Sequence, residues 1–300
     1  MSDIKSVAIA GAFGTFGSHV LKALVDAKFK VKILTRSAKS ADTYAGVEQI
    51  EVDYASIESL SAALKGIDAV VSTVAAAAIG TQGPLIDAAA IAGVKRFIPS
   101  EYGAVTTNPK VQTFPLYDNI FKMRNLLQEK ADAGQTTWTV LALGAFLEFL
   151  FEGPASIVNF KECKALLLDE GDNRFSANSL AASAEAIAGI LKNPIATKNR
   201  VVHISQAILT QNQILKLAQK LRPEDQWEIE KVASSAMREE ALAGFRAGDF
   251  SLPVIVKLIL GTGIAGETYG GAYAETDNDL LGIKQFSGDD LTQSVAEKLA

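Results

Sequence analysis

The sequence predicts an α/β protein in which a doubly wound parallel sheet carries a smaller C-terminal α/β lobe. Short runs rich in Val and Ile alternate with helical patterns over residues 1–146, which is typical of a parallel sheet covered by helices on both faces. A glycine-rich turn joins the first run to the first helical pattern. After Ala145 strand and helix patterns no longer alternate regularly. A chain of 300 residues is also long for a single hydrophobic core. Residues 147–300 are therefore expected to form a second lobe, with some segments returning to the sheet.

The first half contains six expected strands separated by intervals long enough for crossover helices. The strands are expected at Val7–Ala10, Val31–Leu34, Glu48–Val52, Ala69–Val74, Arg96–Pro99 and Thr137–Leu143. Helical spacing of apolar residues places helices at Ser18–Ala27, Ile57–Leu64, Pro84–Ala92 and Asn119–Ala133.

The second half is expected to mix strands and helices in a different order. A strand in the stretch "KALLLDE" is followed by a turn and by a helix that begins near Asn178 or Ser179 and ends before Pro194. Further elements are expected in the remaining sequence: a strand at Val201–Ser205, a helix capped by Thr210 that runs to about Leu221, a loop at "GTGIAGETYGGAY" and a closing helix at Asp289–Leu299.

Composition excludes several function classes. A net charge of −5 argues against a nucleic-acid partner. The single cysteine, Cys163, cannot form an internal disulfide and fits a reducing compartment. The N-terminus has no secretory pattern, and the most apolar run, Leu252–Ala265, is too short to span a bilayer. The expected protein is cytoplasmic, without a nucleic-acid or membrane partner, and is a monomer or homodimer.

Three glycines follow the first expected strand at the entry of the first helix. Gly11, Gly14 and Gly17 are three residues apart in "GAFGTFG". In a Rossmann-type turn the first glycine permits a tight bend, the second lets the backbone approach a pyrophosphate, and the third lets helix and strand pack closely. The free N–H groups and the dipole of the helix end favour an anion. The pattern predicts a dinucleotide site that contains Gly11, Phe13, Gly14, Thr15, Phe16 and Gly17.

The residue after the second expected strand indicates which dinucleotide binds. Arg36 stands about twenty residues after Gly17, where turns specific for NAD carry an acidic residue for the ribose hydroxyls. An arginine there favours the 2′-phosphate of NADP(H), and Lys39 could add a second positive charge. Asp53 ends the third expected strand, where it could accept a hydrogen bond from the adenine amino group or cap a helix. The expected cofactor is NADP(H).

Other site residues are expected where the later strands end, because open α/β sheets bind ligands at the carboxyl ends of their strands. The residues at these positions are Thr73, Ser100, Gly144 and Phe146. The last three are expected to border the nicotinamide. Phe149 and Phe151 are expected to join Phe146 in an apolar wall for a substrate, with packing between the two lobes as the alternative.

Four segments resemble one family when taken in order. "GAFGTFG", "LTR", "RFIPSEYG" and "WTVLALGAF" resemble the isoflavone-reductase-like and NmrA-like branch of the atypical short-chain dehydrogenases/reductases. "DNIFKMRNLLQEKADAGQTTWTVL" and "AETDNDLLGI" are similar to the pattern of fungal members, and the likeness covers nearly the whole chain. The resemblance implies an NADPH-dependent enzyme that reduces a conjugated or benzylic carbon, a carbonyl-like group or an imine. It also implies an alternative, because regulators of the NmrA type bind dinucleotide without known turnover.

The resemblance further implies a catalytic lysine three residues ahead of an aliphatic–arginine pair. Met123 and Arg124 match this pair, so the lysine position holds Ile120. Lys122 follows two residues later, about 100° around the helix from Met123. Hydride transfer leaves negative charge on the acceptor, which a cation or a hydroxyl must stabilise or protonate. Lys122 and Tyr117 are the two candidates for that role.

The expected function is NADPH-dependent reduction of a small apolar aromatic or conjugated substrate, such as an enone, quinone, imine or carbonyl compound. A catalytically weak, NADP(H)-binding redox sensor is the alternative. No metal site is expected, because the two histidines, His19 and His203, lie in a helical and a strand pattern and the chain has no CxxC, HExxH or GxSxG.

Overall fold

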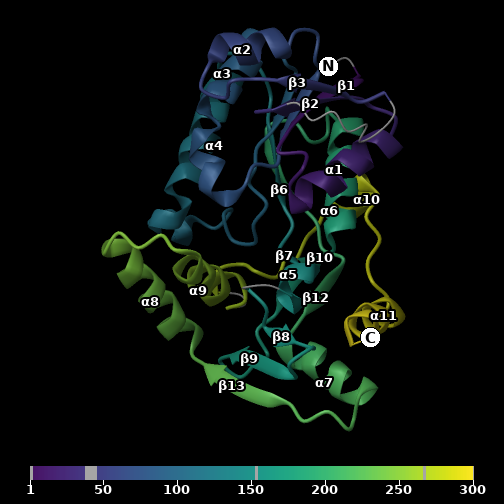
Figure 1. Ribbon diagram of the computed structural model, residues 1–300, viewed down its shortest axis with the longest axis vertical. Helices are drawn as coiled ribbons and strands as arrows, with labels where there is room; N and C mark the ends of the chain where they lie inside the picture. The colour runs from purple at the N-terminus through teal and green to yellow at the C-terminus, as the bar shows by residue number, and fades with distance from the viewer. Residues whose placement is uncertain (1–2, 38–45, 153–154, 266–267, 300) are drawn as a thin grey trace.

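Five of the expected strands form one parallel sheet. They are β1 (Ser6–Ala10), β2 (Lys30–Thr35), β3 (Glu48–Glu51), β4 (Ala69–Ser72) and β5 (Arg96–Ile98). Their order is β3-β2-β1-β4-β5, and all neighbours run parallel (Figure 1). This computed structural model describes residues 3–37, 46–152, 155–265 and 268–299. The order of a doubly wound sheet, with its reversal between β1 and β4, confirms the predicted fold class.

Two further strands continue the sheet beyond β5. They are β6 (Thr139–Ala142) and β11 (Arg200–His203), which run parallel to each other. A parallel bridge between Phe97 and Trp138 joins β5 to the segment in front of β6, and the Phe97 N–H donates to the Thr137 carbonyl at 2.8 Å. A strand from the second half of the chain therefore completes the sheet of the first half.

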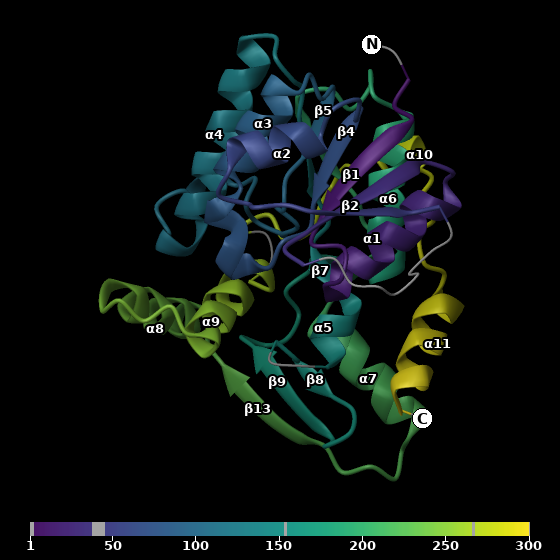
Figure 2. The ribbon, with the colours of Figure 1, turned by 45° about the horizontal axis from the view of Figure 1, so that its top comes forward.

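Helices cover both faces of this sheet. One face carries α1 (Thr15–Asp26), α6 (Leu180–Lys192) and α10 (Asn278–Leu281), and the other carries α2 (Ile57–Ala63), α3 (Gly83–Ile91) and α4 (Asp118–Asp132) (Figure 2). Side chains alternate along β1 accordingly: Val7 and Ile9 pack in the core under α1 and α6, whereas Ala8 and Ala10 pack in the core under α2 to α4. Both cores are apolar, as expected for a buried parallel sheet.

The remaining elements form the smaller lobe in the lower half of Figure 1. Its strands are β7 (Ala145–Phe146), β8 (Val158–Asn159), β9 (Lys164–Leu168), β10 (Phe175–Asn178), β12 (Ala207–Leu209) and β13 (Glu228–Val232). Its helices are α5 (Leu147–Phe151), α7 (Gln211–Leu221), α8 (Ser234–Arg246), α9 (Leu252–Gly263) and α11 (Gly288–Leu299). The strands make two small sheets, β7-β10-β12 and β8-β9-β13. No helix among the described residues is long and apolar enough to cross a membrane.

The structure confirms only some of the elements predicted for the second half. Thr210 begins α7 with a reciprocal capping box to Gln213, as predicted. The loop expected at residues 261–273 begins only after Gly263, because α9 extends to that residue. A Cβ atom on Gly261 would lie 2.9 Å from the Ser234 carbonyl oxygen, so this glycine lets α9 approach α8 closely rather than opening a loop. The sequence patterns predicted no element at β7, β8, β10, β12, β13, α5, α8, α9 or α10.

Within the described residues, three short 3₁₀ helices connect elements near the carboxyl ends of the strands. They are η1 (Ala76–Thr81), η2 (Pro109–Val111) and η3 (Pro115–Tyr117). The first follows β4, and the other two lie in the connection from β5 to α4. These connections lie at the carboxyl ends of β4 and β5, where a ligand of an open α/β sheet is bound.

Candidate functional site

The outer two glycines of the turn are required by the protein itself. Gly11 has φ +86°, and a Cβ atom there would lie 2.6 Å from the Thr73 carbonyl oxygen. A Cβ atom on Gly17 would overlap the Gly11 carbonyl oxygen, because α1 begins directly against the end of β1. Thr73, which follows β4, also holds the turn in place, because its hydroxyl donates to the Ala10 carbonyl at 2.9 Å. These contacts explain the tight bend and the close packing.

Gly14 is different, because nothing in the described fold requires a glycine there. Its φ of −76° is open to any residue, and a Cβ atom would meet only the Gly11 carbonyl oxygen, at 3.4 Å. Gly14 is the N-cap of α1, and no side chain caps this helix end. A side chain at position 14 would only fill space beside the first N–H groups of α1. That space and those donors fit the pyrophosphate of a dinucleotide.

Arg36 lies directly after β2, as predicted, and its side chain is exposed. No carboxylate among the described residues forms an ion pair with it, so the guanidinium can meet a bound anion. Tyr54 is near it: burial raises the pKa of Tyr54 to about 12, the charge of Arg36 opposes this rise, and the hydroxyl donates to the Leu34 carbonyl. The second expected cation, Lys39, lies outside the described residues.

Asp53 is exposed at the end of the β3 segment and also has a local role. Its carboxylate accepts a hydrogen bond from the Ala55 N–H at 2.9 Å, and its own N–H donates to the Ser59 hydroxyl at 3.1 Å. Both bonds organise the entry into α2. The adenine contact expected for Asp53 stays a prediction.

Ser100 joins the ends of β4 and β5. Its hydroxyl donates to the Val74 carbonyl at 2.8 Å, and its N–H donates to the side-chain oxygen of Gln82 at 3.0 Å. Both Ser100 and Gln82 are buried. Gln82 was not found from the sequence, where its only signal is a polar residue in front of an apolar helix.

Gly144 forms the corresponding bend after β6. It has φ +73°, and a Cβ atom would overlap the Ser176 carbonyl oxygen. Its N–H donates to the Tyr273 hydroxyl at 3.1 Å, and this hydroxyl donates to the Ala104 carbonyl at 2.9 Å. Tyr273 therefore ties the connection after β5 to the bend after β6 from a distant loop, and no local sequence pattern indicates it.

Aromatic rings lie in contact along the edge between the glycine turn and the smaller lobe. The Phe16 ring centroid is 4.8 Å from that of Tyr102 and 5.0 Å from that of Phe146. Phe149 continues the series, 5.3 Å from Phe146, and is 40% exposed. Phe151 does not join this edge, because it is buried in the core of the smaller lobe. Phe149 is exposed enough to contact a substrate, as the predicted apolar wall requires, whereas Phe151 is a core residue.

A buried ion pair lies beside Ser100. Glu101 is 3% exposed, and the Arg124 guanidinium of α4 pairs with both of its carboxylate oxygens. Burial raises the pKa of Glu101, and Arg124 opposes that rise. The guanidinium also donates to the Thr106 carbonyl at 3.2 Å and lies 5.3 Å from the Phe121 ring centroid. Both charged residues stand in the motifs quoted above, but the sequence alone did not pair them.

The two candidate proton donors have opposite environments. Tyr117 is buried in an apolar cluster between α4, α8 and α9, where its hydroxyl bonds to Thr262. Burial raises the pKa of Tyr117 to about 12, so the phenol stays protonated. Lys122 is exposed on α4. Ile120, at the expected lysine position, packs against the same apolar cluster as Tyr117.

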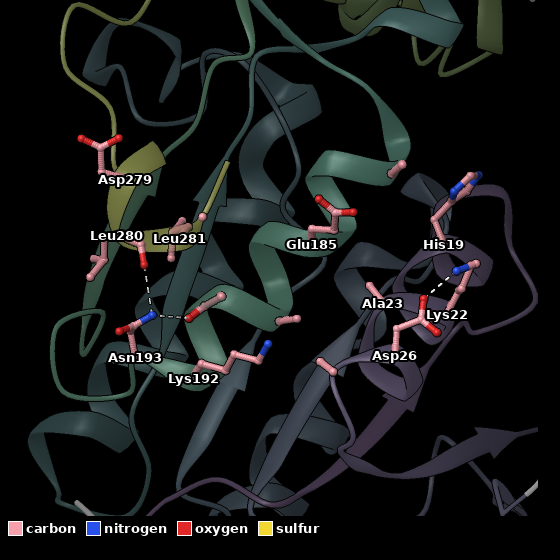
Figure 3. Close-up of a pocket in the computed structure, with 15 residues that line it drawn as sticks. His19, Lys22, Ala23, Asp26, Glu185, Lys192, Asn193, Asp279, Leu280 and Leu281 are labelled. Carbon is pink, nitrogen blue, oxygen red and sulfur yellow. Dashed lines mark hydrogen bonds and ion pairs between the residues drawn. The ribbon is translucent and has the colours of Figure 1, made fainter. Parts of the chain in front are cut away.

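A groove of about 640 Å³ lies between α1, α6 and α10 (Figure 3). In it Lys22 pairs with Asp26, and the Asn193 side chain donates to the Leu280 and Gly189 carbonyls. None of the predicted site residues lines the groove, so it is separate from the candidate site. Among the described residues, no three His, Cys, Asp or Glu side chains lie together as a metal site would require.

The fold and the site define a Rossmann-type α/β protein whose glycine turn and carboxyl edge can hold a dinucleotide. The NmrA-like family model matches residues 3–239, and the chain belongs to this family. "Oxidoreductase poxI" of Penicillium oxalicum is 30% identical, over 96% of this chain and 93% of its own length.

Two solved structures share the whole fold. A crystal structure of isoflavone reductase superposes with a TM-score of 0.77 at 20% identity and covers 98% of this chain and 99% of its own. The NADPH complex of the quinone oxidoreductase QOR2 from Escherichia coli superposes with a TM-score of 0.73 at 19% identity, covering 98% and 100%. These likenesses confirm the resemblance and fold class predicted from the sequence.

Proposed function

We propose that this protein is an NADP(H)-dependent reductase of a small, apolar, aromatic or conjugated molecule. The observation that carries the proposal is Gly14, which the fold does not need and which leaves the N-terminus of α1 open to a pyrophosphate. Arg36, exposed after β2 without an ion-pair partner among the described residues, supports the 2′-phosphate form of the cofactor. The oxidoreductase name of the fungal relative and the NADPH of the bacterial structure support the same assignment.

The residues of this chain would bind and orient the reactants. The first N–H groups of α1 would hold the pyrophosphate, and Arg36 the 2′-phosphate. Ser100, Gly144 and Phe146 would border the nicotinamide, which supplies a hydride when NADPH is bound. The charge left on the acceptor is then balanced by a proton, for which Tyr117 and Lys122 are the candidates.

The proposed substrate class follows from the surface beside the site. The partly exposed Phe149 ring extends the series of Phe16 and Phe146 away from the glycine turn. Aromatic walls of this kind favour flat, apolar molecules, because rings stack or meet edge to face. Enones, quinones, imines and aromatic aldehydes combine such a body with a group that accepts hydride.

A binding and turnover experiment tests the proposal. NADPH fluorescence on titration with the purified protein should show saturable binding, and NADPH absorbance should fall when acceptors from the four classes are added. Oxidation above the rate without protein would support the reductase. Saturable NADPH binding with no oxidation by any class of acceptor would refute it.

One observation favours a second candidate function, an NADP(H)-binding sensor. The position that the family resemblance assigns to a catalytic lysine holds Ile120, which packs in an apolar cluster. A sensor needs differential affinity rather than turnover. Its signature would be a clear difference between the dissociation constants of NADPH and NADP+, with no turnover of any acceptor.

A further inference from the structure

We propose that the buried Glu101–Arg124 ion pair positions the nicotinamide half of the dinucleotide site. The inference rests on the proposed function, because it assigns the pair a role in holding NADPH. Glu101 follows Ser100 at the carboxyl end of β5, in the half of the sheet that lies away from Arg36 and the adenosine. The pair is therefore placed at the end of the cofactor where the hydride leaves.

Three consecutive residues after β5 each fasten a different part of the site. Ser100 bonds to the end of β4 and to Gln82. Glu101 binds Arg124 of α4. Tyr102 donates its hydroxyl to the Ser72 carbonyl at 2.8 Å and places its ring edge-on to Phe16 in the first turn of α1. Glu101 lies between Ser100 and Tyr102 in the chain, so a shift of its backbone would be passed to both neighbours.

The geometry of the pair suits positioning more than stabilisation. Burying Glu101 and most of the Arg124 side chain carries a desolvation cost that the attraction only partly offsets, so such a pair is weak evidence for stability. Arg124 instead fixes direction: its Nε donates to Glu101 at 3.3 Å, and its terminal nitrogen donates to the Thr106 carbonyl at 3.2 Å. The planar guanidinium therefore holds both ends of the loop 101–106 against α4, which a lysine could not do in the same way.

Loss of the Glu101–Arg124 pair should affect the contacts between the aromatic rings but not the backbone of the glycine turn. The rings run from Tyr102 to Phe16 and on to Phe146. The backbone of the turn is held separately, by the Thr73 hydroxyl and by the Gly14 N–H, which donates to the Gly11 carbonyl at 3.0 Å. Loss of the pair should therefore disturb the nicotinamide side and leave the phosphate side intact.

The experiment compares Arg124→Met with Arg124→Lys and with a matched control. Lys130→Met is that control, because Lys130 of the same helix pairs with Asp87 of α3 at 2.7 Å, away from the carboxyl edge. Two ligands are titrated: NADPH, and 2′,5′-ADP, which has the adenosine and both of its phosphates but no nicotinamide. Hydrogen exchange of the ligand-free proteins is measured in peptides covering residues 99–106, which include the segment that Arg124 holds, and residues 145–151, which include Phe146 and Phe149.

The expected result is selective. Arg124→Met should raise the dissociation constant of NADPH about tenfold, which corresponds to a loss of about 1.4 kcal/mol of binding free energy. It should change that of 2′,5′-ADP less than about twofold and speed exchange in both peptides. Arg124→Lys should recover part of the NADPH affinity, and Lys130→Met should match the unmodified protein. Equal weakening of both ligands, equal effects of Arg124→Met and Lys130→Met, or unchanged exchange in both peptides would overturn the inference.

The exchange measurement separates this inference from the proposed function. If the unmodified protein bound neither nucleotide, the proposed function would fall. Faster exchange at residues 99–106 and 145–151 in Arg124→Met alone would still show that the pair positions the aromatic edge, and unchanged exchange would refute that as well.

Discussion

A Cβ atom on residue 17 would overlap the carbonyl oxygen of Gly11, whereas one on residue 14 would meet the same oxygen at 3.4 Å. Replacing each of the two glycines with alanine should therefore have a different effect. We expect Gly17→Ala to lower the free energy of unfolding by about 1–3 kcal/mol, because α1 must move away from β1. Gly14→Ala should keep the free energy of unfolding within about 1 kcal/mol and weaken NADPH binding at least tenfold. Denaturant unfolding and NADPH titration of both variants check this; unimpaired binding by Gly14→Ala would contradict the pyrophosphate assignment.

Arg36 should select between the two nicotinamide cofactors. Arg36→Ala removes a cation that would form charge-assisted hydrogen bonds to the 2′-phosphate, interactions of about 1.5–3 kcal/mol. We expect the dissociation constant of NADPH to rise about 10- to 100-fold, and that of NADH to change less than about threefold. Titration with both cofactors measures the difference. Equal losses for NADPH and NADH would show that Arg36 does not contact the 2′-phosphate.

Proton donation should depend on Lys122 rather than on Tyr117. The Tyr117 phenol is buried in an apolar cluster and bonded to Thr262, and burial raises its pKa to about 12, so it releases a proton poorly. With an acceptor found in the screen, Lys122→Ala should lower kcat about 100-fold at unchanged NADPH affinity, the usual range for loss of a general acid. Tyr117→Phe should keep kcat within about twofold. The reverse pattern would assign the proton to Tyr117.

Phe149 and Phe151 stand two residues apart and should have separate roles. Phe149→Ala should raise KM for an aromatic acceptor about tenfold, through lost ring contacts of about 1–1.5 kcal/mol, with little change in stability. Phe151, 4% exposed and packed 5.1 Å from the Phe160 ring centroid, should cost about 3–5 kcal/mol of stability when changed to Ala. Steady-state kinetics and denaturant unfolding on both variants test the pair. An unaltered KM in Phe149→Ala would remove that ring from the substrate wall.

Asp68 should make the fold sensitive to acid. Burial alone would raise its pKa, but hydrogen bonds from Lys95 and from the Lys5 and Ser6 backbone outweigh it and lower the pKa to about 2. A carboxyl whose pKa is lower in the folded state stabilises the fold above its unfolded pKa, and loses that contribution as the pH falls from about 4 to 2. Asp68→Asn should lower the free energy of unfolding by about 1–2 kcal/mol at pH 7. Its difference from the unmodified protein should shrink over that acid range, as urea unfolding measured at each pH would show.

Local sequence patterns predicted the strands and helices of the first half well, because elements that pack together there mostly follow one another along the chain. Gly11, Gly14 and Gly17 could be interpreted from their spacing alone, and the structure supplies the reason for the outer two. The second half was harder, since its contacts join distant segments: Gly261 reads as a loop residue until α8 lies against it.

The same limit applies to the candidate site. Arg36 and Ser100 follow strands and were found by position, whereas the pairing of Glu101 with Arg124 depends on how α4 packs on the sheet. Tyr273 reaches Gly144 from a loop far along the chain, which no periodicity records.

The pairing of β6 with β11 has a consequence for how the chain is made. While the ribosome is still adding residues 147–199, β6 has an open edge and the apolar face of α1 lacks its cover from α6. The edge of β6 stays unpaired until residue 203 has emerged from the ribosome. Exposed strand edges of this kind can pair with other chains and cause aggregation. Stalled or truncated products that end before β11 should therefore depend on chaperones, and a gene cut after residue 146 should yield insoluble protein rather than a smaller nucleotide-binding domain.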